Sequence, residues 1–280
     1  MDRPKGKLDD LRGEIDEIDT SLHDLIMRRA AIVENIAAAK GEQAASGMRP
    51  GREAEILRRL VARHDGPFPR GSLVRIWREI ISAVTAMQGP YNVAVFDDGS
   101  GGLWDLSRDY FGSCTEISTC SARRDVVSGV ADGTVTHGVL PYPSDEDDRP
   151  WWAGLWSPDA PRIVLRLPFV GIANARERDA RALVIARISP EPTGDDRSLI
   201  MIEMAEERRR VVFAEMLDRA GLDGRLVCAA RDGSLQYLVE AKGFLESGDG
   251  RLRHLMEEQD VERVQIIGAY PVPLSDSARI

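Results

Sequence analysis

The sequence LDDLRGEIDEIDTSLHDLIMRRAAIVENIAAAK, residues 8–40, decides the fold of the N-terminal part of the chain. Residues spaced by threes and fours form one stripe along a predicted long helix. The stripe consists of Leu11, Ile15, Ile18, Leu22, Leu25, Arg29, Ile32, Ile36 and Lys40. Seven of these nine residues are apolar, and the other two are cations.

Arg29 and Lys40 are eleven residues apart, so on a helix they point the same way, about 16 Å apart along the axis. A buried unpaired cation is strongly unfavourable, so each needs an anion. We therefore expect a small anionic ligand between them. The alternative is that both cations lie at the edge of the stripe and reach water. Arg12 is rotated about a quarter turn from their line and faces a different neighbour.

Composition indicates a globular chain of two or three domains, with 280 residues that are 43% hydrophobic and 30% charged. No apolar run approaches the ~20 residues that a bilayer requires, and residues 1–7 are too polar for a signal peptide. We expect a cytoplasmic protein with no membrane partner. The three cysteines show no paired ligand spacing, so neither a disulfide framework nor a metal site is expected.

Charge is unevenly distributed along the chain. Residues 1–90 carry 15 Lys and Arg against 14 Asp and Glu, whereas the remainder carries 22 against 32. The acidic bulk argues against a nucleic-acid partner, which needs a basic face. The near-neutral N-terminal part is the better host for an anion.

Residues 1–90 are predicted to form three helices, at 8–40, 51–64 and about 72–88, the last capped by Ser72. Each helix has polar groups on or beside its apolar face. These groups are Arg29 and Lys40, then Arg52 and Glu53, then Gln88. Such a set binds and polarises an anion, but it contains no nucleophile and no general-base histidine. It suits a unimolecular rearrangement without a cofactor, catalysed by holding one conformer and stabilising developing charge.

Several segments of this region carry a family resemblance. They are Leu11-Arg12 with Ile15-Asp16 and Ile18-Asp19, Leu25 to Arg29, Lys40, Arg49-Pro50-Gly51-Arg52-Glu53, and Trp77-Arg78-Glu79-Ile80-Ile81-Ser82 through Gln88. In this order and spacing, residues 8–88 resemble the AroQ-type, all-α chorismate mutases. The resemblance implies rearrangement of chorismate to prephenate in phenylalanine and tyrosine synthesis. It also implies an intertwined homodimer through the long first helix.

In that family each active site borrows one arginine from the partner chain, and Arg12 would be that residue. Arg12, Arg29 and Arg52 would hold the two carboxylates of chorismate. The structural alternative is a helical oligomerisation module without catalysis. A lyase that removes pyruvate from isochorismate shares the fold and is a further alternative.

The remaining site residues also follow from the resemblance. Lys40 and Gln88 would donate to the ether oxygen, on which negative charge grows as the C–O bond breaks. Glu53 would accept from the ring hydroxyl, and Ile81 and Val84 would line the substrate site. Some members have serine at the position of Val84, so we expect only a modest loss there.

Residues 91–197 change to alternating strands and helices, with strands expected at 92–96, 138–141 and 183–186. The stretch 93–143 resembles the first lobe of prephenate dehydratase, through Arg108-Asp109-Tyr110-Phe111-Gly112 and His137-Gly138-Val139-Leu140-Pro141. Three departures follow. Asp97 and Asp98 would repel a dianionic substrate, Ala180 stands where the family has a catalytic threonine, and most of one lobe is missing. Trp151, Trp152 and Trp156 either cover the apolar surface left behind or form a surface interaction patch.

Residues 198–280 are predicted to form a ferredoxin-like β-α-β-β-α-β unit, which resembles an ACT domain, most specifically over 264–271. The family's amino-acid-binding turn is replaced here by Ala205-Glu206-Glu207-Arg208, and its second loop by Ala229-Ala230-Arg231-Asp232. We therefore expect no phenylalanine inhibition.

The chain is thus predicted to have three parts: an AroQ domain at 1–90, a truncated dehydratase-like α/β region at 91–197 and an ACT-like domain at 198–280. We expect a chorismate mutase with a degenerate second half that braces the dimer, binds a partner enzyme of aromatic amino acid synthesis or senses a ligand. The alternatives are a bifunctional mutase-dehydratase and a non-catalytic regulatory protein that binds chorismate.

Overall fold

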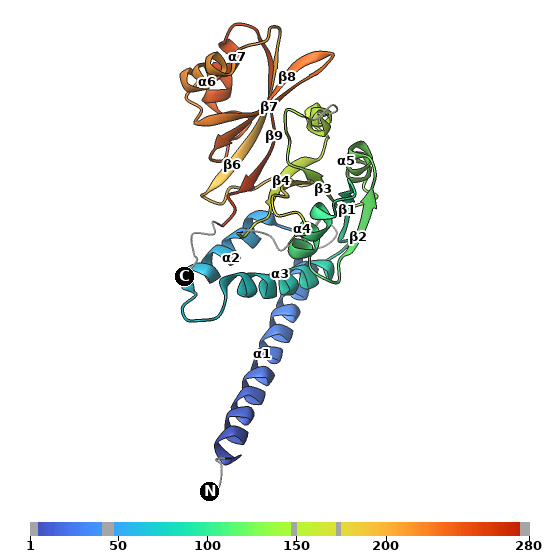
Figure 1. Ribbon diagram of the computed structural model, residues 1–280, viewed down its shortest axis with the longest axis vertical. Coiled ribbons are helices and arrows are strands. Elements are labelled where there is room, and N and C mark those ends of the chain that lie inside the picture. Colours follow the sequence, from blue (N-terminus) through green and yellow to red (C-terminus); the bar gives the residue numbers. More distant parts are fainter. Residues whose placement is uncertain (1–4, 41–47, 147–149, 172–174, 275–280) are drawn as a thin grey trace.

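The computed structural model describes residues 5–40, 48–146, 150–171 and 175–274, and it describes Lys5, Gly6, Lys40 and Asp232 by their backbone alone. The N-terminal part consists of three helices: α1 (Lys5–Lys40), α2 (Pro50–Arg63) and α3 (Arg70–Ala86). Helix α1 projects from the rest of the molecule, and only its C-terminal end lies against the body (Figure 1). The three predicted helices are therefore present, within a few residues of their expected bounds.

The apolar stripe of α1 is exposed in the single chain. Its large residues, from Leu11 to Ile36, are between 46% and 60% exposed. Partial burial begins at Arg29 and Ala30, where α1 approaches α3. A 36-residue helix is about 54 Å long, so most of an apolar face of that length is uncovered.

Helices α2 and α3 pack against each other and against the α/β region. Helix α2 begins with Pro50 in its first turn, where a missing N–H costs nothing, and Glu53 lies near the positive end of the helix dipole. Ser72 lies inside α3 and not at its cap, which is Pro69, so that prediction was wrong. Leu57 and Ile81 belong to the same hydrophobic core as residues of the sheet.

The remaining described chain forms a mixed sheet with helices on it. Its strands are β1 (Asn92–Phe96), β2 (Glu116–Cys120), β3 (His137–Pro141), β4 (Arg162–Leu167), β5 (Ala182–Ala186), β6 (Asp196–Met204), β7 (Gly224–Asp232), β8 (Ser234–Lys242) and β9 (Val261–Pro271). The order is β2-β1-β3-β5-β4-β9-β6-β8-β7. Strand β1 is parallel to β2 and β3, whereas β5 is antiparallel to β3 and β4. Strands β2 and β4 were not predicted.

The helices that accompany the sheet are α4 (Gly102–Phe111), α5 (Arg123–Ala131), the 3-10 helix η2 (Trp151–Trp156), α6 (Arg210–Arg219) and α7 (Gly250–Glu257). Helix α4 contacts α3 as well as β1 and β3, so it lies between the helical region and the sheet. Trp151 and Trp152 are 5% and 0% exposed within a core cluster. Both side chains therefore lie in the core, and the alternative of a surface patch is wrong for both.

The C-terminal strands have the order β9-β6-β8-β7, with every neighbouring pair antiparallel. Helices α6 and α7 lie together beside them (Figure 1), with the Phe213 ring stacked 4.6 Å from Tyr237. Strand β9 also pairs with β4 at Gly268, where an added Cβ would lie 2.2 Å from the carbonyl oxygen of Ile163. Glycine is needed for this close approach, which joins both parts into one sheet.

The sequence predicts that the helix after β6 begins at Glu206. In the structure this helix, α6, begins at Arg210, so the prediction of its start was wrong. The Arg208 N–H donates to the Tyr237 hydroxyl at 3.0 Å, and its guanidinium pairs with Asp260 at 2.9 Å. These contacts hold the segment before the helix in a non-helical path. Residue Arg208 of the turn 205–208 is thus bound by other parts of the protein.

Candidate anion-binding site

Arg29 lies where α1 meets the body of the molecule, and its charge is incompletely paired. Its Nη1 atom is buried and has no hydrogen-bond partner among the described residues. Burial lowers the pKa of Arg29, and the nearby Glu53 carboxylate opposes that shift. The structure therefore brings together two of the predicted site residues, from α1 and α2.

Glu53 is 4% exposed and is bound by two donors. Its Oε2 accepts from Arg78 Nη1 at 2.6 Å and from the Tyr110 hydroxyl at 3.1 Å. Both donors end on the same oxygen. Oε1 has no hydrogen-bond donor among the described residues, so it can accept from another group.

Arg78 is the residue that holds this cluster together. Its Nε donates to the Tyr110 carbonyl at 2.7 Å, and its guanidinium lies 3.6 Å from the centroid of the Tyr110 ring. Burial disfavours the charge, but Tyr110 and Glu53 outweigh it and raise the pKa of Arg78. Burial likewise raises the pKa of Tyr110 far above its usual range, which keeps the hydroxyl protonated as a donor.

His137 extends the cluster into the sheet. It is 1% exposed, its ring centroid lies 5.3 Å from that of Tyr91, and its Nδ1 lies 2.8 Å from Thr136 Oγ1. Burial lowers the pKa of His137 to about 4, with Glu53 opposing the shift. His137 is therefore uncharged at neutral pH, and it is not equipped to balance the Glu53 carboxylate.

The other predicted site residues lie apart in the single chain or serve local contacts. Arg12 is exposed and pairs with Asp9 at 3.2 Å. Arg52 is exposed and pairs with Glu55 at 2.9 Å.

Gln88 is half-buried, and its Nε2 donates to the Val84 carbonyl at 3.1 Å. Ile81 and Val84 are buried on the face of α3 that carries Arg78. The Lys40 side chain lies outside the described residues. The single chain thus presents a partial site, built on Arg29 and Glu53.

Two residues of this cluster, Arg78 and Tyr110, were not predicted as site residues. Arg78 could have been found by the argument applied to Arg29, because it follows Val74 by four residues and precedes Ile81 by three on a buried face. Tyr110 carried no such signal. It comes from α4 and lies 57 residues from Glu53 in the sequence.

The loop 97–102 is bound by a side chain from another part of the chain. Ser100 Oγ donates to Glu177 at 3.1 Å, and Arg176 binds Asp105 at 2.9 and 3.0 Å. Ala180 is 7% exposed and packs into the core. The Glu177 carboxylate thus lies at this loop, which also carries Asp97 and Asp98.

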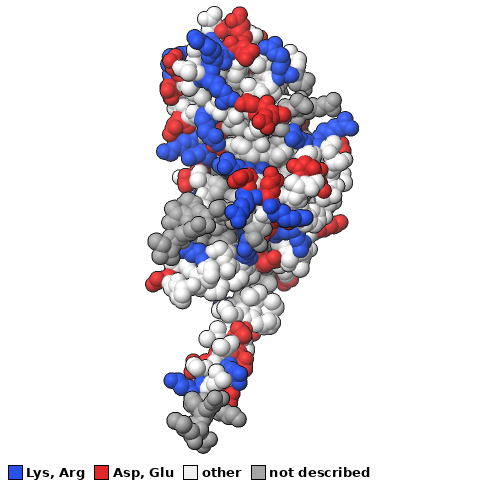
Figure 2. Space-filling view, in the orientation of Figure 1, with Lys and Arg blue, Asp and Glu red and all other residues white. Residues whose placement is uncertain are grey.

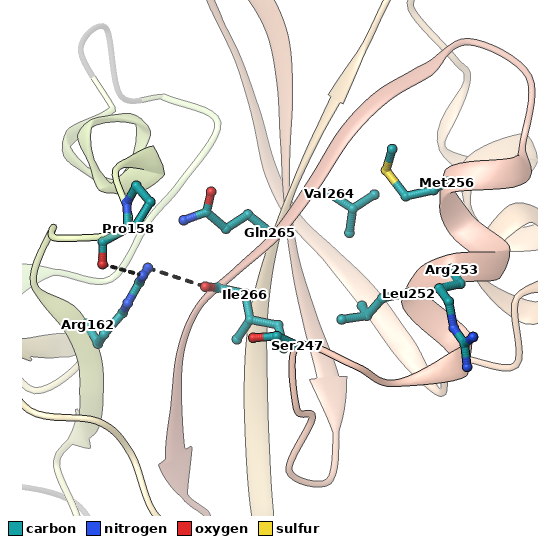
Figure 3. Close-up of a pocket in the computed structure, with 9 residues that line it drawn as sticks. All are labelled: Pro158, Arg162, Ser247, Leu252, Arg253, Met256, Val264, Gln265 and Ile266. Atoms are coloured by element: carbon teal, nitrogen blue, oxygen red, sulfur yellow. Dashed lines mark hydrogen bonds between the residues drawn. The ribbon is translucent and has the colours of Figure 1, made fainter.

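A separate hollow of about 350 Å³ lies between β4, β9 and α7 (Figure 3). Apolar residues such as Leu252 and Val264 line it together with Arg162. The Arg162 guanidinium donates to the carbonyls of Pro158 at 2.9 Å and Ile266 at 3.4 Å. None of the predicted site residues lines this hollow.

Surface features give no competing site in the described part of the chain. Lys and Arg side chains are interspersed with Asp and Glu on the face shown in Figure 2. Among the described residues, no helix is long and apolar enough to cross a membrane. The same residues contain no group of three or more His, Cys, Asp or Glu that could hold a metal ion.

Residues 11–89 match the family described as "Chorismate mutase type II". The chain is 31% identical over 139 residues to a bifunctional chorismate mutase/prephenate dehydratase of Aquifex aeolicus, covering 48% of this chain and 38% of that protein. It is 30% identical over 136 residues to the protein of the same name from Pseudomonas aeruginosa, covering 47% and 37%. The chain therefore spans well under half of the length of these curated relatives.

Solved structures that match part of the chain include a prephenate dehydratase from Streptococcus mutans, with 12% identity, a TM-score of 0.46 and coverage of 64% of this chain and 97% of that chain. Another is GqqA, described as a novel type of quorum quenching acylase, with 17% identity, a TM-score of 0.48 and coverage of 65% and 96%. The aligned 139 residues of the Aquifex relative extend beyond the length of the family match. Residues 11–89 are thus similar to the type II chorismate mutases, and the similarity to the bifunctional relatives continues beyond them.

Proposed function

We propose that this protein is a chorismate mutase, which rearranges chorismate to prephenate in the synthesis of phenylalanine and tyrosine. The observation that carries the proposal is Arg29, a partly buried cation beside Glu53 whose Nη1 has no partner among the described residues. It lies inside a domain that matches the type II mutases. A buried, unpaired donor of this kind is stabilised when an anion binds.

The reaction needs binding and electrostatics more than covalent chemistry. The ether C–O bond of chorismate breaks while a C–C bond forms in the same molecule, so no atom is gained or lost and no cofactor is required. Lys40 and Gln88 donate to the ether oxygen as its negative charge grows. Arg29 and Arg52 hold carboxylates, which keeps the substrate in its reactive conformer.

The remaining contacts come from α2, α3 and a second chain. Glu53 accepts from the ring hydroxyl through Oε1, since Oε2 is already bound by Arg78 and Tyr110. Ile81 and Val84 form the apolar wall. Arg12 is supplied by the partner subunit and completes the set of carboxylate ligands.

We propose a homodimer in which the long α1 helices of two copies cover each other. Ile15, Ile18 and Leu25 are 57%, 58% and 60% exposed in the single chain, on a helix that projects from the body (Figure 1). Monomeric proteins rarely expose a continuous apolar stripe of such length. A second copy is the fitting occupant because it presents the same stripe and brings Arg12 of the partner subunit toward the site.

The second half of the chain is proposed to be a reduced dehydratase lobe at 91–197 and an ACT-like ferredoxin-like unit at 198–280. Ala180 has no hydroxyl and is buried, and Glu177 is bound at the loop 97–102. Both observations argue against dehydratase activity, although a bifunctional enzyme remains the alternative. A cytoplasmic location and a partner enzyme of the same pathway remain predictions from the sequence.

The test is to supply purified full-length protein with chorismate and follow the loss of its ultraviolet absorbance. Prephenate and phenylpyruvate are then assayed separately. We expect prephenate without phenylpyruvate, and loss of most of the rate in Lys40→Ala. Phenylpyruvate would support the bifunctional alternative, and pyruvate formed from isochorismate would support the lyase. Binding without turnover would support a regulatory protein.

The dimer is tested by light scattering of the wild type and of Ile18→Asp. A charge at this position opposes burial of the stripe, so we expect the variant to be monomeric and to lose the mutase activity that needs Arg12 from the partner subunit. Ile76→Asp is the matched control, because Ile76 is also an exposed isoleucine (46%) but lies on α3. A monomeric wild type with full activity would contradict the proposed assembly.

A further inference from the structure

The donor that completes the binding of Glu53 belongs to the α/β region and not to the mutase domain. Tyr110 lies in α4, beyond the end of the family match at residue 89. Its hydroxyl donates to Glu53 Oε2 at 3.1 Å, beside Arg78 Nη1 at 2.6 Å. A residue outside the mutase domain therefore contacts a carboxylate that the proposed mechanism uses.

The position of Tyr110 is strongly determined by packing. Its neighbour Phe111 is 0% exposed, and the Tyr110 and Phe111 rings lie 5.3 Å apart. The Arg78 guanidinium lies against one face of the Tyr110 ring and also binds its carbonyl oxygen. The hydroxyl therefore has little freedom to leave Glu53.

Contacts between α3 and the chain around α4 hold the two elements in register. Arg75 pairs with Asp109 at 3.1 Å, and both carboxylate oxygens of Glu79 accept from the Ser113 N–H at 3.0 Å. These contacts lie on either side of Tyr110 in the sequence. These contacts attach the α/β region to the mutase helices close to the place where the Tyr110 hydroxyl binds Glu53.

A single hydroxyl can decide how the carboxylate is oriented. Arginine prefers to bind both oxygens of a carboxylate, and two arginines, Arg29 and Arg78, are near Glu53. Tyr110 competes for Oε2 and so holds the carboxylate in the arrangement in which Arg78 uses that oxygen alone. Oε1 then stays available for the hydroxyl of a substrate.

We propose that Tyr110 is a positioning residue of the mutase, so that the α/β region supplies part of the mutase machinery. This inference rests on the proposed function. It gives the degenerate second half of the chain a role that needs no activity of its own. It also explains why Tyr110 is buried against α2 and α3 with its hydroxyl aimed at a carboxylate.

The experiment is Tyr110→Phe in the full-length protein, with kcat and KM for chorismate measured across pH. Phenylalanine keeps the ring and its packing against Arg78 but removes the donor. We expect kcat/KM to fall roughly 10-fold, mostly through kcat.

Tyr142→Phe is the matched control, because the Tyr142 hydroxyl donates to another buried carboxylate, Glu240, at 2.9 Å. It should leave kcat and KM unchanged. If Tyr110→Phe lowers the unfolding midpoint, rates are compared at a temperature at which circular dichroism shows both proteins folded. A profile for Tyr110→Phe that superimposes on that of the wild type would overturn the proposal.

A double-mutant cycle with Glu53→Gln separates positioning from general destabilisation. If Tyr110 acts through Glu53, Tyr110→Phe should cause little further loss in the Glu53→Gln background. Full additivity of the two losses would contradict the inference. An inactive wild type would instead refute the proposed function itself, so the two failures are distinguishable.

Discussion

Two buried carboxylates in this molecule have similar hydrogen-bond partners but differ in the number of cations near them. Glu53 lies in α2 and faces the α/β region, where Tyr110 binds it. Glu240 lies in β8, near the join between the two parts of the sheet. Both are almost fully buried, at 4% and 6% exposure. Each accepts hydrogen bonds from tyrosine hydroxyls and an arginine: Tyr110 and Arg78 for Glu53, and Tyr142, Tyr270 and Arg225 for Glu240.

The difference lies in the supply of donors. Two arginines, Arg29 and Arg78, act on Glu53, and Arg29 retains a buried Nη1 with no partner among the described residues. A single arginine, Arg225, pairs with Glu240 in the described structure. Burial raises the pKa of Glu240, but its donors outweigh burial and the net shift is downward. A buried carboxylate with a complete set of donors is a structural feature, whereas an excess of cationic donors indicates a place for an anion.

The largest expected effect comes from removing the excess donor. Arg29→Ala deletes a ligand of a substrate carboxylate, and we expect kcat/KM for chorismate to fall by about 100-fold or more, which is at least ~3 kcal/mol of transition-state stabilisation. Steady-state kinetics measure the loss. Because the guanidinium is partly buried without a full set of partners, stability should change little or rise slightly.

Arg28→Ala is the control, since Arg28 is the exposed neighbour of Arg29 on the same helix. It should retain nearly all activity. Equal losses of kcat/KM in both variants would mean that the total charge of α1 matters and not the position of Arg29. The proposed difference between the Glu53 and Glu240 sites would then be contradicted.

The same contrast separates what could be predicted from what could not. Periodicity predicted α1, and β1 was predicted at its observed bounds, because apolar spacing is local. Strand β2 escaped prediction because it is an edge strand, with Glu116 and Thr119 exposed and no apolar run. Arg29 and Glu53 were predicted as site residues from spacing and resemblance, and the structure places them near each other.

The rest of the Glu53 cluster depends on contacts that sequence spacing does not encode. Arg78 reaches a carboxylate 25 residues away, and Tyr110 reaches the same carboxylate across 57 residues and a change of architecture. The pairing of β4 with β9 at Gly268 could not be predicted either, because these two strands are far apart in the sequence. Pairings of this kind require the fold to be known first.

The second effect concerns stability at the Glu240 site. Glu240→Gln keeps the shape but removes the charge, and it leaves Tyr142 and Tyr270 with a weaker acceptor. We expect the free energy of unfolding to fall by about 2–3 kcal/mol, as measured by urea denaturation. Mutase kinetics of the folded protein should be unchanged. A large loss of kcat with normal stability would contradict the structural role assigned to this carboxylate.

The third effect is a pH dependence specific to the Glu53 side of the molecule. The folded-state pKa of His137 is about 4 because of burial, whereas an unfolded histidine titrates near 6.5. Between these values the unfolded chain binds the proton and the folded chain does not. The contribution of His137 to stability is therefore intact above about pH 6.5 and is lost as pH falls toward 4.

The measurement is the free energy of unfolding of wild type and His137→Gln at several pH values from 7 to 4.5. We expect the wild type to lose about 2 kcal/mol more than the variant over this range. Other groups titrate in both proteins, so only the difference between the two curves is diagnostic. Parallel curves would show that His137 titrates normally and is not held in a dry environment beside Tyr91.

The smallest effect should come from Arg225→Ala, and it sharpens the comparison with Arg78. The Arg225 side chain is 59% exposed, whereas that of Arg78 is 3% exposed. Water screens the pair with Glu240, so we expect a loss of only about 0.5–1 kcal/mol in urea denaturation. Arg78→Ala would leave the Glu53 carboxylate buried without its ion-pair partner. We expect the free energy of unfolding to fall by about 3 kcal/mol or more in that variant. Equal losses of unfolding free energy in the two variants would show that solvent exposure of the arginine does not distinguish the two sites. The excess of cations around Glu53 would then be the only difference between them.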